Sequence, residues 1–168
     1  MFFLLIVFIT CITAVALYNR IVRRKYEMNK LFESTYNLHK ERYQLIPVLM
    51  PLLNTHMDVE KAMNTDIKSW RQQVLSRNTN IDEKIIANNH LDESLNTLLT
   101  AASGYPALRS DTDFLALESS WNGLATRISD SKQAYNQAVD VYNRSLSYFP
   151  TNLIVEIFKI HPKIKFEI

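Results

Sequence analysis

The feature that most constrains this chain is an uncharged apolar run at its N-terminus. Phe2 to Leu17 reads FFLLIVFITCITAVAL, and the first charged side chain is that of Arg20. A helix needs about 17–25 apolar residues to cross a bilayer, and the run from Phe2 to Tyr18 reaches the lower end of that range. The sequence therefore predicts a transmembrane anchor over residues 1–19, with the lipid bilayer as a partner.

Two alternatives to an uncleaved anchor stay open. A cleaved signal peptide would account for the apolar run and for the small residues Ala14-Val15-Ala16, although such a peptide normally begins with basic residues and Met1-Phe2-Phe3 has none. A lipoprotein signal would use Cys11, but Phe8-Ile9-Thr10 before it is a poor match to the small residues that such signals carry. The uncleaved anchor fits these flanking residues best.

A basic cluster follows the apolar run and consists of Arg20, Arg23, Arg24 and Lys25. Basic residues beside a membrane helix stay on the cytoplasmic side. We therefore expect a single-pass protein of the cell inner membrane, with its N-terminus outside and its remaining domain, residues 20–168, in the cytoplasm. The cluster can also attract anionic headgroups, at about 1 kcal/mol per basic residue near the surface, or act as a topology determinant alone.

The remaining chain has the pattern of an all-helical domain. Glycine occurs only twice in 168 residues, and apolar residues recur at steps of three and four. We expect the anchor to continue into the first helix of the domain as far as Pro47 and Pro51, which remove backbone donors and should kink or break it. A second helix is expected to carry the apolar residues from Val59 to Val74. Asn80 and Glu83 then predict a capping box at the start of a third helix.

The last long helix has the most regular pattern. Ser110 or Asp111 can cap it, and apolar steps of three and four run without a slip from Phe114 to Phe149. Gly123 inside it predicts a close helix crossing, and Pro150 ends it. Thr151-Asn152 can then start a short apolar helix from Leu153 to Phe158. Long helices, short loops and heptad-like faces predict an antiparallel bundle of three or four helices, in part coiled-coil-like.

Several short motifs accompany these helices. Tyr43-Gln44-Leu45-Ile46-Pro47 precedes the second helix, Gly104-Tyr105-Pro106-Ala107-Leu108 precedes the last long helix, and Tyr135-Asn136, Tyr142-Asn143 and Phe149-Pro150 occur within or at the end of it. In order and spacing they resemble the LemA family, which is also similar in having an N-terminal anchor. The resemblance implies a bacterial, membrane-anchored helical bundle with no established enzymatic activity. Some relatives sit beside membrane proteases of the HtpX type or take part in membrane-organelle assembly.

The sequence departs from the family pattern mainly at positions where the family has polar or charged residues. The family's Asp and Asn around the Leu-Ile-Pro core are Gln44 and Val48 here, an acidic residue is replaced at Ala125, and the arginine before the first Tyr-Asn pair is Lys132. A charge-dependent site of the family would therefore be altered in this chain. The repeated Tyr-Asn pairs, seven residues apart, lie on one helix face. They predict either a buried bundle seam, with the amides bonding neighbouring helices, or a partner-binding stripe.

No motif for catalysis is present in the sequence. Two glycines cannot build a phosphate-binding loop, and none of His39, His56, His90 and His161 has metalloprotease or di-iron spacing. We interpret His56 with Glu60, and His90 with Asp92 and Glu93, as solvated helix faces rather than half of a metal site. The sequence thus predicts no catalytic residue, no metal and no cofactor.

The leading functional hypothesis is a non-enzymatic, membrane-anchored scaffold or adaptor that self-associates or organises a membrane protein complex. The alternative is an accessory subunit of a membrane protease or transporter. A third hypothesis, a metal-dependent enzyme, would need ligands such as His39, His56 and His90 to converge in the bundle core. A net charge of +2 without a clustered basic face argues against nucleic acid as a partner, and no small-molecule substrate is indicated.

Overall fold

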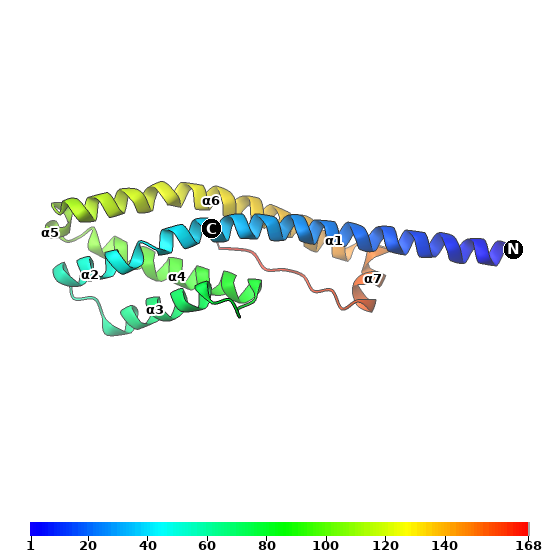
Figure 1. Ribbon diagram of the computed structural model, residues 1–168, viewed down its shortest axis with the longest axis horizontal. Helices are drawn as coiled ribbons and strands as arrows, with labels where there is room; N and C mark the ends of the chain where they lie inside the picture. The colour runs from blue at the N-terminus through cyan, green and yellow to red at the C-terminus, as the bar shows by residue number, and fades with distance from the viewer. Residues whose placement is uncertain (168) are drawn as a thin grey trace. The chain divides into compact units, whose positions relative to one another are not determined.

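The structure of the protein is a computed structural model that describes residues 1–167. Its helices are α1 (Phe2–Tyr43), α2 (Ile46–His56), α3 (Lys61–Leu75), α4 (Ile81–Ala102), α5 (Pro106–Arg109), α6 (Thr112–Ser147) and α7 (Thr151–Ile157) (Figure 1). The described residues contain no strand, and the predicted all-α fold with long helices is confirmed.

The chain divides into two compact units. Unit 1 comprises Met1–Glu33 and Ala134–Lys165, and unit 2 comprises Ser34–Gln133 with the residues that follow from Phe166. Helices α1 and α6 each contribute residues to both units. The predicted division into an anchor over 1–19 and a domain over 20–168 stays a prediction, and its last residue lies outside the described residues.

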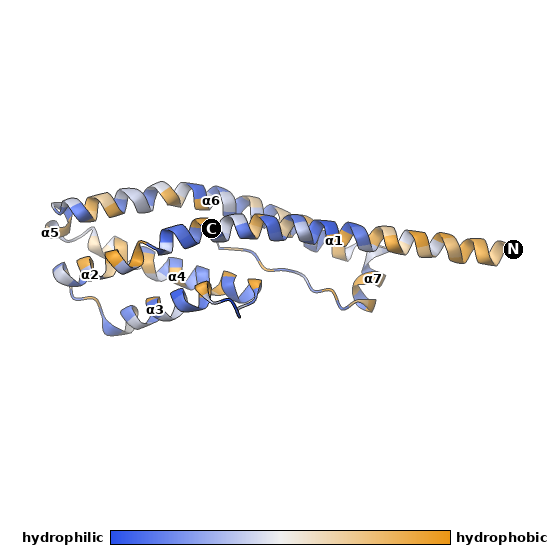
Figure 2. Ribbon diagram, viewed as in Figure 1, coloured by the Kyte–Doolittle hydropathy of each residue, from blue (hydrophilic) through white to orange (hydrophobic). Residues whose placement is uncertain are grey.

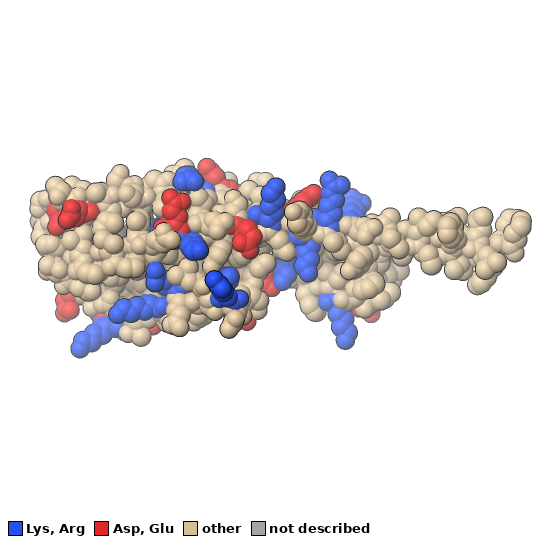
Figure 3. Space-filling model, viewed as in Figure 1, with Lys and Arg blue, Asp and Glu red and all other residues tan. Residues whose placement is uncertain are grey.

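The N-terminal part of α1 is apolar, and its side chains are exposed. Figure 2 shows it as a continuous hydrophobic stretch, and Figure 3 shows no charged side chain on its visible face. Among the described residues, one helix is long and apolar enough to cross a membrane, and none of its most apolar 18-residue window is buried. A signal sequence has the same properties, so these features support an anchor by length and composition only.

Proline sets the first helix break, as predicted. Helix α1 ends at Tyr43 and α2 begins at Ile46, so that Pro47 falls in the first turn of α2. A first-turn residue has no intrahelical partner for its N–H, which makes proline acceptable there and unfavourable in a continuous helix. Pro51 lies inside α2 and does not end it.

Side-chain caps begin two of the other helices. Asn80 Oδ1 accepts a hydrogen bond from the Glu83 N–H at 2.9 Å and Glu83 Oε2 accepts one from the Asn80 N–H at 3.2 Å, so the predicted capping box of α4 is confirmed. At α6, Asp111 Oδ1 accepts from the N–H groups of Asp113 and Phe114, both at 2.9 Å. Of the two predicted caps, Asp111 is therefore the one used.

Three details of the prediction are wrong. Helix α6 ends at Ser147, two residues before the predicted end. Helix α7 begins at Thr151, as predicted, but ends at Ile157, one residue before the predicted end. A Cβ added at Gly123 would meet no atom within 4 Å among the described residues, so no helix crosses closely there. Gly123 is exposed, and nothing in the structure explains a glycine at this position.

Unit 2 is a helical bundle with an apolar core. Helices α3 and α4 pack along each other, and α2 meets α5. The core side chains come from each of these helices and include Leu53, Ile67, Leu95 and Leu108, all fully buried. Unit 2 also buries a smaller group of polar and charged side chains, including Arg42, Asp92 and Lys132.

Candidate functional site

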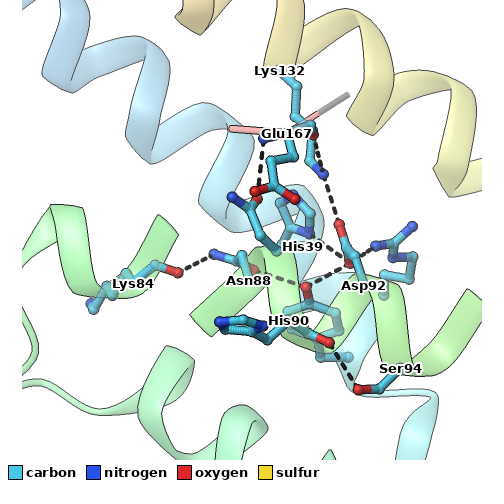
Figure 4. Close-up of polar contacts among 11 residues, drawn as sticks. His39, Lys84, Asn88, His90, Asp92, Ser94, Lys132 and Glu167 are labelled. Atoms are coloured by element: carbon cyan, nitrogen blue, oxygen red, sulfur yellow. Dashed lines mark hydrogen bonds and ion pairs between the residues drawn. The ribbon is translucent and has the colours of Figure 1, made fainter. Parts of the chain in front are cut away.

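A buried carboxylate, that of Asp92 on α4, organises the polar centre of unit 2. Its Oδ1 atom forms an ion pair with Arg42 Nη2 of α1, and its Oδ2 atom accepts a hydrogen bond from Lys132 Nζ of α6 at 2.7 Å (Figure 4). Tyr43 Oη donates to Asp92 Oδ1 at 2.8 Å. Arg42, Asp92 and Lys132 are each at most 8% exposed, so the three charges lie out of water.

Two further buried groups complete this arrangement, which we call the Asp92 cluster (His39, Arg42, Tyr43, Asn88, Asp92 and Lys132). Asn88 Oδ1 accepts from Tyr43 Oη at 2.8 Å, and Asn88 Nδ2 donates to the Lys84 carbonyl at 2.9 Å. His39 is fully buried, and its Nδ1 atom lies 3.8 Å from Asp92 Oδ1, too far for a hydrogen bond. The His39 Nε2 atom has no hydrogen-bond partner among the described residues.

Burial and charge fix the protonation states of the cluster. Burial lowers the pKa of His39 from 6.5 to about 3, against the attraction of Asp92, so its imidazole is neutral at neutral pH. Burial by itself would raise the pKa of Asp92. The positive charges around it, those of His39 when protonated, Arg42 and Lys132, outweigh burial, so the pKa of Asp92 is lowered. Burial, helped by the charge of Asp92, raises the pKa of Tyr43 well above 10.

The cluster contains two positive charges, on Arg42 and Lys132, and one negative charge, on Asp92, so it has a net charge of +1. Aromatic rings lie against both cations: the guanidinium carbon of Arg42 is 4.6 Å from the Trp121 ring centroid, and Lys132 Nζ is 5.6 Å from that of Phe166. The electron-rich ring face attracts a cation and contributes more when water is excluded. Beside the cluster, a cavity of about 610 Å³ has walls that include Arg42, Asp92, Trp121 and Lys132.

The C-terminal tail adds residues to this centre. Phe166 is buried and its ring stacks on that of His39, with centroids 5.6 Å apart. The Glu167 N–H donates to Asn89 Oδ1 at 3.2 Å, and the Glu167 carbonyl accepts from Lys132 Nζ at 3.2 Å (Figure 4). Lys132 therefore connects the carboxylate of α4 to the backbone of the tail.

Within unit 1, the predicted Tyr-Asn stripe also holds the tail. Asn143 donates from Nδ2 to the Lys163 carbonyl at 2.7 Å, and its Oδ1 accepts from the Lys163 N–H at 2.8 Å. Tyr135 Oη donates to the Ile164 carbonyl at 3.2 Å. Tyr135 and Tyr142 are buried, as a bundle seam requires. The expectation that the asparagine amides bond neighbouring helices is wrong for Asn143, which pairs with an extended segment instead.

The other predicted residues lie apart from the Asp92 cluster. Of the basic residues, Arg20, Arg23 and Lys25 are exposed, and the half-buried Arg24 donates from Nη1 to the Val141 carbonyl at 3.3 Å. The family-motif residues fall into a buried group, Ile46, Tyr135, Asn136 and Tyr142, a half-buried group, Leu45 and Asn143, and an exposed group, Pro47, Tyr105, Pro106, Phe149 and Pro150.

The histidines have separate surroundings. His56 Nε2 lies 3.5 Å from Asp111 Oδ2, and the His90 ring stacks on Trp70 with centroids 4.7 Å apart. Across residues 1–167, no group of three His, Cys, Asp or Glu side chains is placed to hold a metal ion. His39 is the histidine that enters the polar centre, and it does so as a neutral, buried ring.

The Asp92 cluster is not among the features predicted from the sequence. Reading Asp92 as part of a solvated helix face is wrong, because Asp92 is buried. A signal was present: Asp92 continues the 3-4-3 spacing of Ile85, Asn88 and Leu95, all buried, on the inner face of α4. Lys132 likewise lies between the buried residues Ile128 and Tyr135 at steps of four and three. Charged residues on the apolar stripes of different helices indicate a buried ion pair.

The fold and the cluster define a class of protein: an all-helical chain with long helices, a buried ionic centre and an exposed apolar N-terminal segment. The sequence model of the LemA family matches residues 32–168, and the chain belongs to this family. No curated protein matches the chain significantly.

Removing the carboxylate charge should destabilise the protein strongly. Asp92→Asn leaves Arg42 and Lys132 buried without a counter-charge, and we expect the free energy of unfolding to fall by about 3–5 kcal/mol. Urea unfolding of the full chain in detergent measures it. Glu93→Gln, on the same helix but exposed, is the matched control and should change stability by less than about 0.5 kcal/mol. Equal stability of the two variants would contradict a structural role for Asp92.

The buried His39 makes stability depend on pH. Its folded-state pKa, about 3, lies below its ordinary value of 6.5, so between these values the unfolded chain binds a proton that the folded chain does not. Stability is therefore full above pH 6.5 and is lost as the pH falls toward 3. The loss should approach about 1.4 kcal/mol per pH unit between pH 6 and 4.

The control for this pH dependence is a comparison of two histidine variants by urea unfolding at several pH values. His39→Gln should remove the His39 part of the slope, whereas His161→Gln, at an exposed position, should keep it. A His39→Gln slope as steep as that of the unaltered chain would show that other groups cause the acid sensitivity.

Proposed function

We propose that this LemA family protein is a non-enzymatic, membrane-anchored scaffold that self-associates or organises a membrane protein complex. The observation that carries the proposal is α1, a single unbroken helix from Phe2 to Tyr43. It contains the exposed apolar segment, the basic cluster and, at its C-terminal end, Arg42 and Tyr43 of the Asp92 cluster. An apolar segment inserted in the bilayer would keep the rest of the chain at the membrane, which suits a protein that holds other membrane proteins in place.

The chemistry of the polar centre supports a structural rather than a catalytic role. A general acid or base works best when its pKa lies near the working pH. In the Asp92 cluster, the pKa values of His39 and Asp92 are shifted downward and that of Tyr43 upward, all away from neutrality. The partners of the Asp92 side chain, Arg42, Tyr43 and Lys132, all belong to helices other than α4. The cluster is thus suited to hold helices together.

The same proposal includes a location and an orientation. The apolar segment would cross the cell inner membrane once, with the N-terminus outside and the rest of the chain in the cytoplasm. The support is the absence of charge before Arg20 and the concentration of Arg20, Arg23, Arg24 and Lys25 directly after the run.

Self-association or partner binding is tested by crosslinking. Amine-reactive crosslinking of the full chain in native membranes, followed by size analysis and mass spectrometry, should give a homo-oligomer or a species with a specific membrane protein. Ile9→Arg is the control, because an arginine at the centre of the apolar run opposes insertion by about 2.5–3.5 kcal/mol and should reduce the crosslinked species. A strictly monomeric, partner-free chain would remove the scaffold proposal.

Orientation is tested with a reporter at the C-terminus. A reporter active only in the cytoplasm should be active when fused to the unaltered chain. Replacing Arg20, Arg23, Arg24 and Lys25 with glutamine should lower that activity and place part of the population in the opposite orientation, because these are the charges that set topology. The matched control replaces Lys30 and Lys40, both exposed and farther from the run. An external C-terminus in the unaltered chain would overturn the orientation.

A further inference from the structure

Large apolar side chains gather on the surface of unit 1 where α6 ends and α7 follows. This corner, residues 148–158, exposes Tyr148, Phe149, Leu153, Ile157 and Phe158, and exposure reaches 79% for Phe149 and 74% for Ile157. Soluble surfaces rarely expose apolar residues in so dense a group unless the group meets a partner or a membrane. In unit 1, exposed large apolar side chains also line the N-terminal part of α1.

The corner contacts α1 at the point where the apolar run ends. The ring of Phe158 packs on that of Tyr18, with centroids 5.0 Å apart and planes tilted by 41°. Tyr18 is the last residue of the uncharged run before Asn19 and Arg20. The apolar surface of the corner is therefore continuous with that of the segment assigned to the membrane.

Polar and apolar groups meet at this contact as they do at a bilayer boundary. A cavity of about 270 Å³ has Leu17, Arg20 and Arg24 of α1 on one side and Tyr148 and Phe149 on the other. Aromatic side chains are enriched at the level of the headgroups, where apolar rings meet acyl chains, and arginine reaches the phosphates from the same level. Helix α7 exposes Leu153 and Ile157 beside these residues, and a helix that lies in the interface likewise exposes apolar side chains to lipid.

We propose that the corner formed by residues 148–158 is a second membrane contact, which lies in the headgroup–acyl boundary of the bilayer that α1 crosses, with Arg20 and Arg24 facing lipid phosphate. The inference rests on the anchor in the proposed function, and it adds a surface remote in sequence from that anchor. The chain would then meet the membrane at two segments, and the corner would limit rotation of α1 about its own axis. The occupant of the exposed apolar surface is lipid rather than another protein.

The experiment places one fluorophore at a time on the full chain in lipid vesicles and measures quenching by brominated lipids. The native Cys11, the single cysteine, labels the anchor without any substitution. In a Cys11→Ser background, Phe149→Cys and Ile157→Cys label the corner. Tyr26→Cys, on α1 beyond the basic cluster and 70% exposed, is the matched control. All three altered side chains are exposed, so folding should be unaffected.

We expect quenching at Cys11, at position 149 and at position 157, and none at position 26. Quenching at the two corner positions should be stronger when bromine lies near the headgroup than near the chain end, and the reverse should hold at Cys11. Quenching at Cys11 without quenching at the corner would overturn the inference and leave the anchor standing. Absence of quenching at all four positions would overturn both.

Discussion

The fold of unit 2 depends on one interaction, the burial of Asp92 between Arg42 and Lys132. An ionised carboxylate loses several kcal/mol of hydration when it leaves water, and only close opposite charge with good hydrogen bonding repays this. Asp92 obtains these from α1 and α6, through partners 50 and 40 residues away in the chain. Arg42 pairs with Oδ1 and Lys132 with Oδ2, so the loss of either cation would leave one carboxylate oxygen without its charged partner, and the two helices are needed together.

The excess positive charge of this centre explains why aromatic rings and the tail gather around it. Trp121 lies over Arg42, Phe166 lies near Lys132 and His39, and the Glu167 carbonyl accepts from Lys132. His39 remains neutral because burial lowers its pKa, and the positive charges of Arg42 and Lys132 lower it further. A shift of α4 by one residue would turn Asp92 by about 100° away from Arg42 and Lys132 and leave the two cations without a counter-charge, so the cluster also fixes the register of the helices. These are the properties of a structural centre, and they agree with the scaffold proposed above.

In unit 1 the surface rather than the interior supports the proposed membrane contacts. Its buried tyrosines, Tyr135 and Tyr142, fill the interior, while its apolar residues at the start of α1 and around α7 stay exposed. The contact of Tyr18 with Phe158 joins the two exposed surfaces. Apolar area left in water is unfavourable by about 25 cal/mol per Å², which gives a physical reason for both surfaces to meet lipid.

The sequence by itself determined the all-helical class, the family, the apolar segment, the break before Pro47 and the capping box at Asn80, and it narrowed the cap of α6 to Ser110 or Asp111. These features depend on hydrogen bonds and steric limits within a turn or two of helix, and the residues that decide them are neighbours in the chain. Only the tertiary structure decided that Asp92 is buried, that Asn143 and Lys132 hold the C-terminal tail, and that Phe158 reaches Tyr18. Each of these contacts joins segments at least 20 residues apart, and a charged residue on a helix looks the same in sequence whether water or a distant cation will face it.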